Sequence, residues 1–160
     1  WETTMNNNDN NPEFYMTIAL EEAKKAHDEG EIPVGAAIVF KDGVIATAHN
    51  TTRQCSDPTA HAELIAIKQA AMVLKNERLN GCRMYVTKEP CAMCAGAIVH
   101  ARIEKLYIGV KDKRFGACGT VLNVCGNGVL NHKPQIIFGI LEEECKNLLK
   151  SFFEQLRKKG

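Results

Sequence analysis

MYVTKEPCAMCAGAIVHARIEKLYIGV, residues 84–110, decides the fold of this chain. It predicts a short strand over Met84–Thr87, a helix over Pro90–His100 and another strand over Leu106–Val110. Strands that alternate with helices indicate an α/β protein whose sheet is covered on both faces. We therefore expect a three-layer α/β/α sandwich.

The residues before and after this stretch extend the alternation. Val34–Phe40 and Val44–His49 flank an Asp-Gly turn and predict a β-hairpin. Ile136–Phe138 is a further short strand. Together with the two strands of residues 84–110, these segments predict a five-stranded mixed sheet.

Three further helices are expected around this sheet. The first covers residues 12–29, and the second runs from Asp57, a suitable N-cap that is followed by Pro58, to about Lys75. The third lies at the C-terminus, where one apolar stripe recurs at helical spacing and consists of Leu141, Cys145, Leu148, Leu149, Phe152 and Leu156.

Composition limits the classes of protein to which this chain can belong. Its 160 residues, of which 45% are hydrophobic and 24% charged, suit a single globular domain. The sequence lacks an apolar run of the ~20 residues needed to cross a bilayer, and it lacks a secretory signal. We therefore expect a cytoplasmic protein with no membrane partner. The net charge is +1, so a nucleic-acid partner would have to bind a local basic patch.

The N-terminus is expected to precede the domain. Trp1–Thr4 stand before Met5, a natural starting residue, and we interpret them as a cloning remnant. The asparagine-rich run Asn6–Asn11 is predicted to be a disordered lead-in. Residues 1–11 are therefore assigned to this lead-in, and residues 12–160 to one domain.

Two short motifs predict a metal site. Cys91 and Cys94 are separated by two residues at the start of a helix, so they lie on one face and can share a metal ion. His61 supplies a third ligand. Three protein ligands leave the fourth tetrahedral position of Zn²⁺ open for water, which distinguishes catalytic from structural zinc. We predict one zinc ion per subunit.

Glu63 is the predicted catalytic residue. With two thiolates and a neutral imidazole, a zinc centre is about neutral, and a nearby carboxylate can take a proton from bound water. His61 and Glu63 are two residues apart, and on an ideal helix their side chains would diverge by roughly 200°. Both residues can serve one site only if the tip of the helix enters it.

The remaining five cysteines show no ligand spacing and are predicted to be structural; they are Cys55, Cys82, Cys118, Cys125 and Cys145. Taken alone, Cys91 and Cys94 could be a thiol redox pair, which predicts no zinc and a reducible bridge. The combination of His-x-Glu with Pro-Cys-x-x-Cys on two successive helices instead matches the signature of zinc-dependent nucleobase deaminases.

The sequence around these motifs resembles the bacterial tRNA-specific adenosine deaminases. The likeness runs from about Phe14 to Phe153, and its clearest segments are residues 32–36, 48–50, 57–63, 89–103, 131–132 and 139–141. The resemblance implies a cytidine deaminase-like fold, a homodimer and a tRNA anticodon stem-loop as partner. The implied reaction converts the wobble adenosine of an arginine tRNA to inosine, with the base flipped into the zinc pocket.

The same resemblance implies the residues that contact the substrate. Asn50 is expected to contact the target nucleoside. The other pocket residues are expected to be Ile32, Pro33, Val34 and Ala62. Asp112 aligns with an acidic residue that contacts the anticodon loop, and its alternative role is that of a solvated carboxylate in a turn.

Two basic segments suit contact with RNA. Residues 111–133 are rich in glycine and asparagine, and they are long for a passive connection, which makes them a candidate functional loop. The basic residues of this loop are Lys111, Lys113, Arg114 and Lys133. The basic end of the last helix, Arg157–Lys159, is either a contact to an RNA backbone or a solubilising helix end.

Two other functions stay open at this point. One is a deaminase that acts on a free base such as guanine or cytosine, which needs a closing lid and no basic surface. The other is a non-catalytic zinc or RNA-binding module. Such a module has no use for the carboxylate of Glu63.

Overall fold

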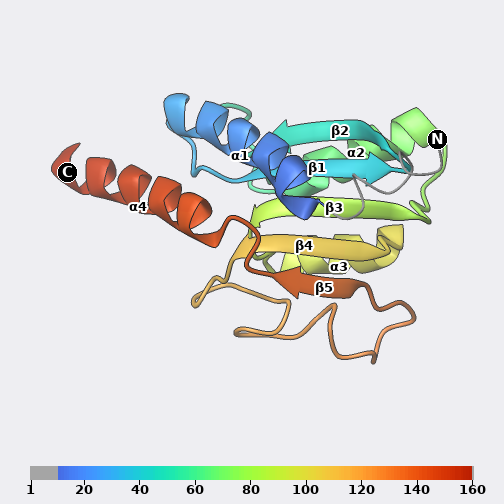
Figure 1. The fold of residues 1–160 in the computed structure, drawn as a ribbon. Helices are drawn as coiled ribbons and strands as arrows, with labels where there is room; N and C mark the ends of the chain where they lie inside the picture. Colours follow the sequence, from blue (N-terminus) through green and yellow to red (C-terminus); the bar gives the residue numbers. More distant parts are fainter. Residues whose placement is uncertain (1–10, 160) are drawn as a thin grey trace.

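The computed structural model describes residues 11–159, and over this range its elements alternate as the sequence predicts (Figure 1). In chain order they are α1 (Pro12–Asp28), β1 (Gly35–Phe40), β2 (Gly43–His49), α2 (Ala62–Leu74), β3 (Cys82–Lys88), α3 (Ala92–Ala101), β4 (Lys105–Val110), β5 (Gln135–Phe138) and α4 (Glu142–Lys159). Most of the predicted lead-in, residues 1–10, lies outside the described range. Asn11 caps α1, because its side-chain oxygen accepts a hydrogen bond from the Phe14 N–H at 3.3 Å.

The sheet is mixed, as predicted, with strand order β2-β1-β3-β4-β5. β1 is antiparallel to both β2 and β3, whereas β3, β4 and β5 are parallel to one another. In register, Ala36 of β1 pairs with Val86 of β3, and Met84 of β3 pairs with Leu106 of β4. The parallel half of the sheet is therefore built by the stretch that starts at β3.

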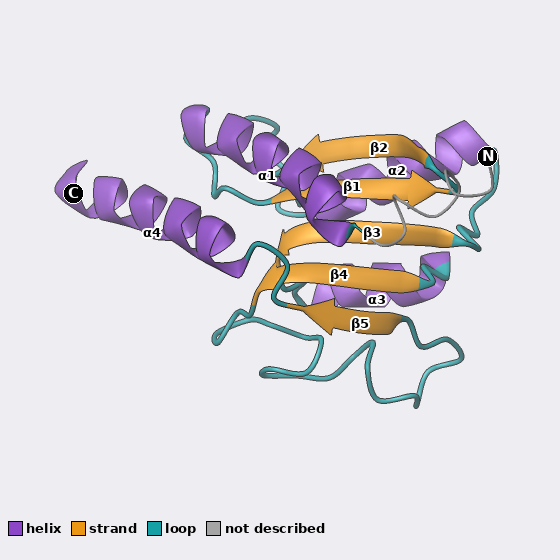
Figure 2. Ribbon diagram, in the orientation of Figure 1, coloured by secondary structure: helices purple, strands orange, loops and turns teal. Residues whose placement is uncertain are grey.

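The helices cover both faces of the sheet, which confirms the three-layer sandwich (Figure 2). Side chains alternate between the two faces along each strand. Those that pack against α2 and α3 are Ala36, Ile38, Met84, Val86, Leu106 and Ile108. Those on the opposite face, under α1, are Ala37, Val39, Tyr85 and Tyr107. α4 joins α1 on this second face, where Gly109 leaves room for Cys145.

The second and third helices begin later than predicted. α2 begins at Ala62 with His61 as its N-cap, so the prediction that Asp57 caps this helix is wrong. The Asp57 carboxylate instead accepts hydrogen bonds from the N–H and hydroxyl of Thr59, at 2.8 and 2.7 Å, and closes a separate turn. α3 begins at Ala92 rather than Pro90, and Cys91 is its N-cap.

The C-terminal helix is only partly covered. Cys145 and Phe152 of its apolar stripe are buried, whereas Leu156 is exposed. Figure 1 shows why: α4 projects away from the sheet, beyond the C-terminal ends of β3 and β4. None of the helices in residues 11–159 is long and apolar enough to cross a membrane.

Candidate metal centre and substrate pocket

The first turns of two helices supply the candidate metal ligands. His61 and Cys91 are the N-cap residues of α2 and α3, and each has extended backbone angles. Neither side chain caps its own helix, so both are free to bind a ligand. Cys94 follows in the first turn of α3 and is fully buried.

The three ligand atoms have the spacing of a tetrahedral zinc site. His61 Nδ1 lies 3.6 Å from Cys91 Sγ and 3.5 Å from Cys94 Sγ. Zinc bonds of about 2.3 Å to sulfur and 2.1 Å to nitrogen, at a tetrahedral angle, place such atoms about 3.6 Å apart. All three atoms lie within 4.8 Å of one another. They fit one zinc ion, and the fourth position is left to water.

The electrostatics of the cluster favour metal binding. Hydrogen bonds with Cys94 and His61 outweigh burial and lower the pKa of the Cys91 thiol to about 3, so Cys91 is a thiolate at neutral pH. The thiolate is the form that binds zinc. The hydrogen bond with Cys91 raises the pKa of Cys94, and burial adds to this effect. The partial positive charge at the start of α3 further favours negative charge at this position.

Glu63 lies beside the ligands. It is the second residue of α2, and its side chain is 4% exposed. Burial raises the pKa of its carboxyl. The charge of His61 opposes this rise, and the charge of Cys91 adds to it. The expected conflict between His61 and Glu63 disappears because His61 is extended rather than helical. The tip of the helix thus enters the site, as the sequence required.

Asn50 and the Ile32–Val34 turn, both predicted to belong to the pocket, are in contact. Ile32, Pro33 and Val34 form a tight turn, closed by a hydrogen bond of 2.8 Å from the Val34 N–H to the Ile32 carbonyl. Asn50 is buried, and its N–H donates to the Val34 carbonyl at 3.1 Å. Ala62 is fully buried at the start of α2. Their contacts with a substrate stay predictions.

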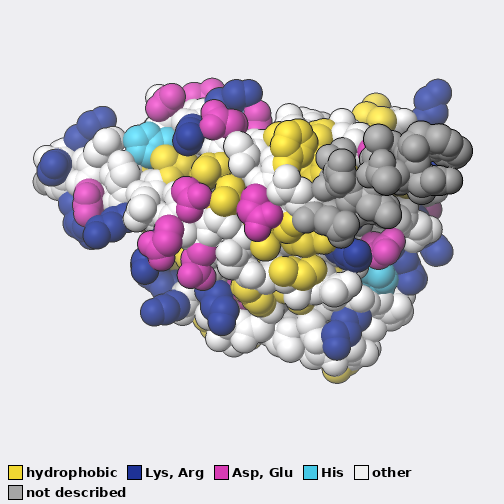
Figure 3. Space-filling model, in the orientation of Figure 1, with side chains coloured by type: hydrophobic (Ala, Val, Ile, Leu, Met, Phe, Trp, Pro, Cys, Tyr) yellow, Lys and Arg dark blue, Asp and Glu magenta, His cyan; other side chains and the backbone are white. Residues whose placement is uncertain are grey.

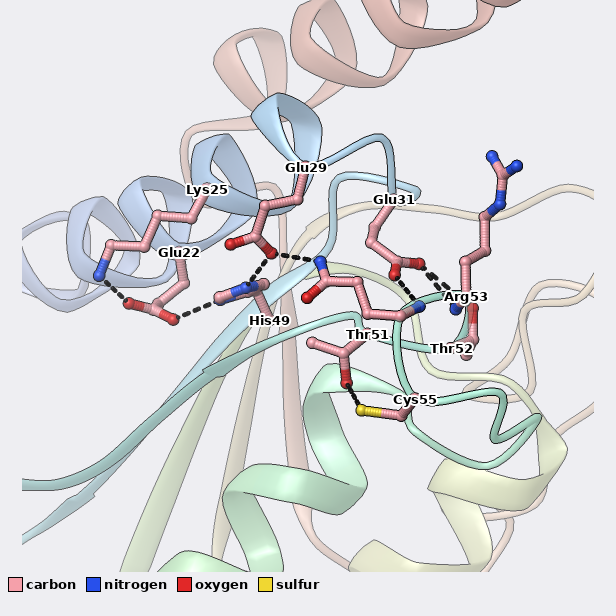
Figure 4. Close-up of polar contacts among 10 residues, drawn as sticks. Glu22, Lys25, Glu29, Glu31, His49, Thr51, Thr52, Arg53 and Cys55 are labelled. Atoms are coloured by element: carbon pink, nitrogen blue, oxygen red, sulfur yellow. Dashed lines mark hydrogen bonds and ion pairs between the residues drawn. The ribbon is translucent and has the colours of Figure 1, made fainter.

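The segment between Asn50 and His61 is held by a buried glutamate that the sequence did not single out. Glu31 is 0% exposed, and its carboxylate accepts from the N–H groups of Arg53 and Gln54 at 3.1 and 2.8 Å. Figure 4 shows this carboxylate directed at the backbone of the segment. Thr51 N–H donates to the carbonyl of Ala60, the residue before His61.

An ion-pair cluster fastens the same segment to α1 (Figure 4). His49, at the end of β2, lies between Glu22 and Glu29, with nitrogen–oxygen distances of 2.9 and 2.8 Å. Gln54 donates to Glu29 at 2.7 Å. Burial opposes the charge on His49, but the two carboxylates outweigh it and raise its pKa.

Glu89 is the second organising carboxylate that sequence reasoning missed. It is 3% exposed, stands two residues before Cys91 and accepts from the N–H groups of Asp112 (3.1 Å), Cys118 (3.0 Å) and Thr120 (3.2 Å). The Thr120 hydroxyl also donates to it, at 2.5 Å. The available signal was the Glu-Pro-Cys sequence, in which a carboxylate stands two residues before a metal ligand.

Asp112 is an organiser of its own turn. Its carboxylate accepts from the N–H groups of Arg114 and Phe115 at 2.9 and 3.1 Å, and it pairs with Lys88 at 3.1 Å. Burial opposes ionisation, yet these partners lower its pKa. Its side chain is therefore a partly buried turn carboxylate rather than a freely solvated one, and its contact with RNA stays a prediction.

The other cysteines divide into two groups. Cys82, Cys118, Cys125 and Cys145 are buried, which agrees with a structural role. Cys55, for which a structural role was also predicted, is exposed, and its thiol lies 3.6 Å from the Thr51 hydroxyl.

An α/β/α sandwich that carries a His-Cys-Cys centre with a buried carboxylate beside it defines the class of zinc-binding deaminases. Residues 9–110 match the family model of the cytidine and deoxycytidylate deaminase zinc-binding region. The chain therefore belongs to the cytidine and deoxycytidylate deaminase family. This result confirms zinc as the expected cofactor.

Three relatives of this chain have named activities. A tRNA-specific adenosine deaminase of Bacillus subtilis (strain 168) is 45% identical over 147 residues, which are 92% of this chain and 91% of that protein. A solved chain from studies of A-to-I editing by tRNA:A34 deaminases at the wobble position of transfer RNA is 41% identical, with a TM-score of 0.82. It covers 84% of this chain and 98% of its own. Guanine deaminase from Bacillus subtilis is 35% identical, with a TM-score of 0.61, over 68% of this chain and 69% of that one.

Proposed function

We propose that the protein hydrolyses the 6-amino group of the wobble adenosine in a tRNA anticodon, giving inosine and ammonia. The observation that carries the chemistry is the zinc-like spacing of His61 Nδ1 from the two sulfurs, 3.6 and 3.5 Å, with Glu63 buried beside them. Similarity to the tRNA-specific adenosine deaminase of Bacillus subtilis carries the choice of substrate.

Glu63 moves the protons in this proposal. When bound, zinc supplies a water whose pKa is lowered to about 7. In the reaction Glu63 would take a proton from the attacking water and pass it to N1 of adenine. It would then take the proton of the new hydroxyl group at C6 and pass it to the departing amine, so that ammonia leaves and the C6 oxygen becomes the carbonyl of inosine. The buried carboxylate serves as both base and acid, because it lies beside the centre and is shielded from bulk water.

The pocket residues position the base in this reading. Asn50 hydrogen-bonds the nucleoside, and the apolar wall consists of Ile32, Pro33, Val34 and Ala62. The base reaches this pocket by leaving the stacked loop of the RNA. This arrangement is supported by the hydrogen bond from the backbone N–H of Asn50 to the Val34 carbonyl, which holds Asn50 next to the apolar wall.

The anticodon loop binds along the segment that follows β4. Lys111, Lys113 and Arg114 give this segment positive charge, and Asp112 contacts the RNA there. Phe115 is 61% exposed, with the Arg114 guanidinium 5.5 Å from its ring centroid. An exposed aromatic ring is a platform on which an unpaired base of an RNA loop stacks. A free-base enzyme has no use for it.

A second basic surface lies at the end of α4. Lysine and arginine side chains gather there (Figure 3), and the last turn contains Arg157, Lys158 and Lys159. In our proposal this end lies along the RNA backbone, because its positive side chains pair with phosphate groups. The arginine tRNA is proposed as the substrate from the family resemblance.

We further propose that the protein is a cytoplasmic homodimer with one zinc ion in each subunit. Apolar side chains are exposed on the α2 and α3 layer, and they are Met72 (78%), Val73 (57%) and Met93 (37%). Exposed apolar side chains on the helices of this layer support contact with a second copy.

A free-base guanine deaminase is the second candidate, favoured by the 35% identity to the enzyme of Bacillus subtilis. An ammonia-release assay separates the two. The substrates are an anticodon stem-loop with a wobble adenosine, free guanine, free cytosine and free adenosine. We expect ammonia from the stem-loop only, and none from a matched stem-loop with guanosine at the wobble position. Release from a free base only would overturn the proposal.

A further inference from the structure

Cys118 and Cys125 form a buried pair of thiols that the proposed deamination does not use. Their sulfur atoms lie 3.0 Å apart, and the side chains are 3% and 1% exposed. Both residues belong to the segment between β4 and β5, whose tip is open to solvent at Val121 (50%) and Leu122 (54%). The pair is separate in sequence from Cys91 and Cys94.

The backbone holds the two thiols face to face. Val124 N–H donates to the Ala117 carbonyl at 2.8 Å, and Gly119 N–H donates to the Leu122 carbonyl at 2.8 Å. These bonds close a narrow turn with one cysteine at each side. Glu89 fixes the Cys118 side, because its carboxylate accepts from the Cys118 N–H at 3.0 Å. The sulfurs therefore stay together without a covalent bond between them.

We propose that Cys118 and Cys125 are a reversible thiol–disulfide modification site whose oxidant is a small hydroperoxide. A disulfide needs its sulfurs about 2.05 Å apart, so the pair must close by only about 1 Å. The tip of the turn is exposed at Val121 and Leu122, so opening of the turn would admit a small oxidant to the sulfurs. The proposal does not depend on the substrate of the deaminase.

The chemistry balances with one hydroperoxide molecule. The hydrogen bond with Cys118 lowers the pKa of Cys125, so Cys125 is the thiol that reacts first. Its thiolate attacks a peroxide oxygen; an S–O bond forms, the O–O bond breaks, and the leaving oxygen takes a proton. Cys118 then attacks the Cys125 sulfur. The S–S bond forms and the S–O bond breaks, and the Cys118 proton leaves with hydroxide as water.

The disulfide would clamp the segment that carries the RNA-facing residues. Two bonds tie this segment to the residues just before Cys91: Cys118 N–H donates to the Glu89 carboxylate at 3.0 Å, and Ala117 N–H donates to the Pro90 carbonyl at 2.9 Å. A covalent link between Cys118 and Cys125 restricts the unfolded chain and removes one way for the turn to open. We expect the melting temperature of the zinc-loaded protein to rise by several degrees.

Graded oxidation of the zinc-loaded protein with hydrogen peroxide tests the proposal. Cleavage after glutamate releases Lys105–Glu142, which contains Cys118 and Cys125 and no other cysteine. We expect this peptide to become lighter by two hydrogen atoms before zinc is released, and dithiothreitol to reverse the change. The melting temperature should rise in parallel.

Cys118→Ser and Cys125→Ser are the matched variants. Neither should gain the cross-link or the rise in melting temperature, and Cys145→Ser should behave as wild type. Sulfinic or sulfonic acid at Cys118 or Cys125 without a cross-link would overturn the proposal. Loss of zinc before any cross-link forms would overturn it as well. The wild-type peptide measurement stands even if a serine variant folds poorly.

Discussion

Two segments flank the metal centre, residues 50–60 and 112–125. A buried glutamate holds each of them, but the further contacts of the two segments differ. In each, one buried glutamate accepts hydrogen bonds from the backbone: Glu31 for the first segment and Glu89 for the second. The first segment is fastened again by the cluster of His49, Glu29 and Gln54. The second is longer, and its carboxylate accepts four hydrogen bonds, from the N–H groups of Asp112, Cys118 and Thr120 and from the Thr120 hydroxyl.

Glu63 is a third buried glutamate, and its surroundings differ from those of Glu31 and Glu89. Glu31 and Glu89 have carboxylates filled by backbone donors, whereas burial is the largest influence on Glu63 and raises its pKa. A carboxylate whose oxygens accept several backbone hydrogen bonds stabilises the fold. A carboxylate beside a metal site can instead move protons. The comparison of these three residues leads to tests that separate stability from turnover.

Replacing Glu63 should have the largest effect on turnover. We expect Glu63→Ala to lower deamination of the stem-loop by about 10³-fold or more, because the proton carrier is gone. Zinc content should stay at one per chain, and the melting temperature should change little, since burial disfavours the charged carboxylate that the variant removes. Glu77→Ala, at an exposed carboxylate, is the matched control. Turnover by Glu63→Ala at the wild-type rate would refute the assignment.

Glu89→Gln and Glu31→Gln should destabilise the protein by different amounts. Hydrogen bonds to charged groups contribute about 1.5–3 kcal/mol, so we expect Glu89→Gln to lower the free energy of unfolding by about 2–3 kcal/mol. Glu31→Gln should cost about half as much, because His49 and Gln54 also hold its segment. Urea titration of both zinc-loaded variants measures the difference.

The same pair should differ in kinetics. In the proposed function the Glu89 segment presents Phe115 to the RNA, and Glu89→Gln should loosen it, so KM for the stem-loop should rise several-fold while kcat changes less. Equal destabilisation and equal kinetics in the two variants would show that the two segments do not differ in the way described.

The His49 cluster should give the smallest effect, and it should depend on pH. The raised pKa of His49 adds stability in full below about 6.5, its ordinary value, and this contribution is lost as the pH rises through the folded value. Hydrogen bonds with His49 and Lys25 outweigh burial and lower the pKa of Glu22, so its contribution is lost only at acid pH, below its ordinary 4.5. Wild type should therefore exceed His49→Gln by about 1 kcal/mol or less near pH 6, and the gap should shrink towards pH 9. Thermal melts across this range provide the measurement, and a gap that widens with pH would contradict the sign.

Local patterns predicted the strands and the metal ligands, because both depend on near neighbours in sequence. The alternation in residues 84–110 gave the two central parallel strands, and Cys-x-x-Cys with His-x-Glu gave the centre. The start of α2 was wrong by several residues, because Asp57-Pro58-Thr59 forms a turn whose signals are shared with a helix start.

The supporting carboxylates could not be found in this way. Glu31 and Glu89 accept from backbone N–H groups that lie more than twenty residues away, and backbone donors leave no mark in the side-chain sequence. The pairing of Cys118 with Cys125 was hidden for a similar reason, since it depends on the shape of a turn in a segment with weak periodicity.

The N-cap positions of His61 and Cys91 have a consequence for stability. A cap residue normally satisfies free N–H groups of its helix, and here neither side chain makes such a hydrogen bond. A zinc ion bound by both residues would join the two helix starts, and its binding free energy would add to the stability of the fold. An engineer who moves the catalytic centre must therefore also rebuild the two helix starts.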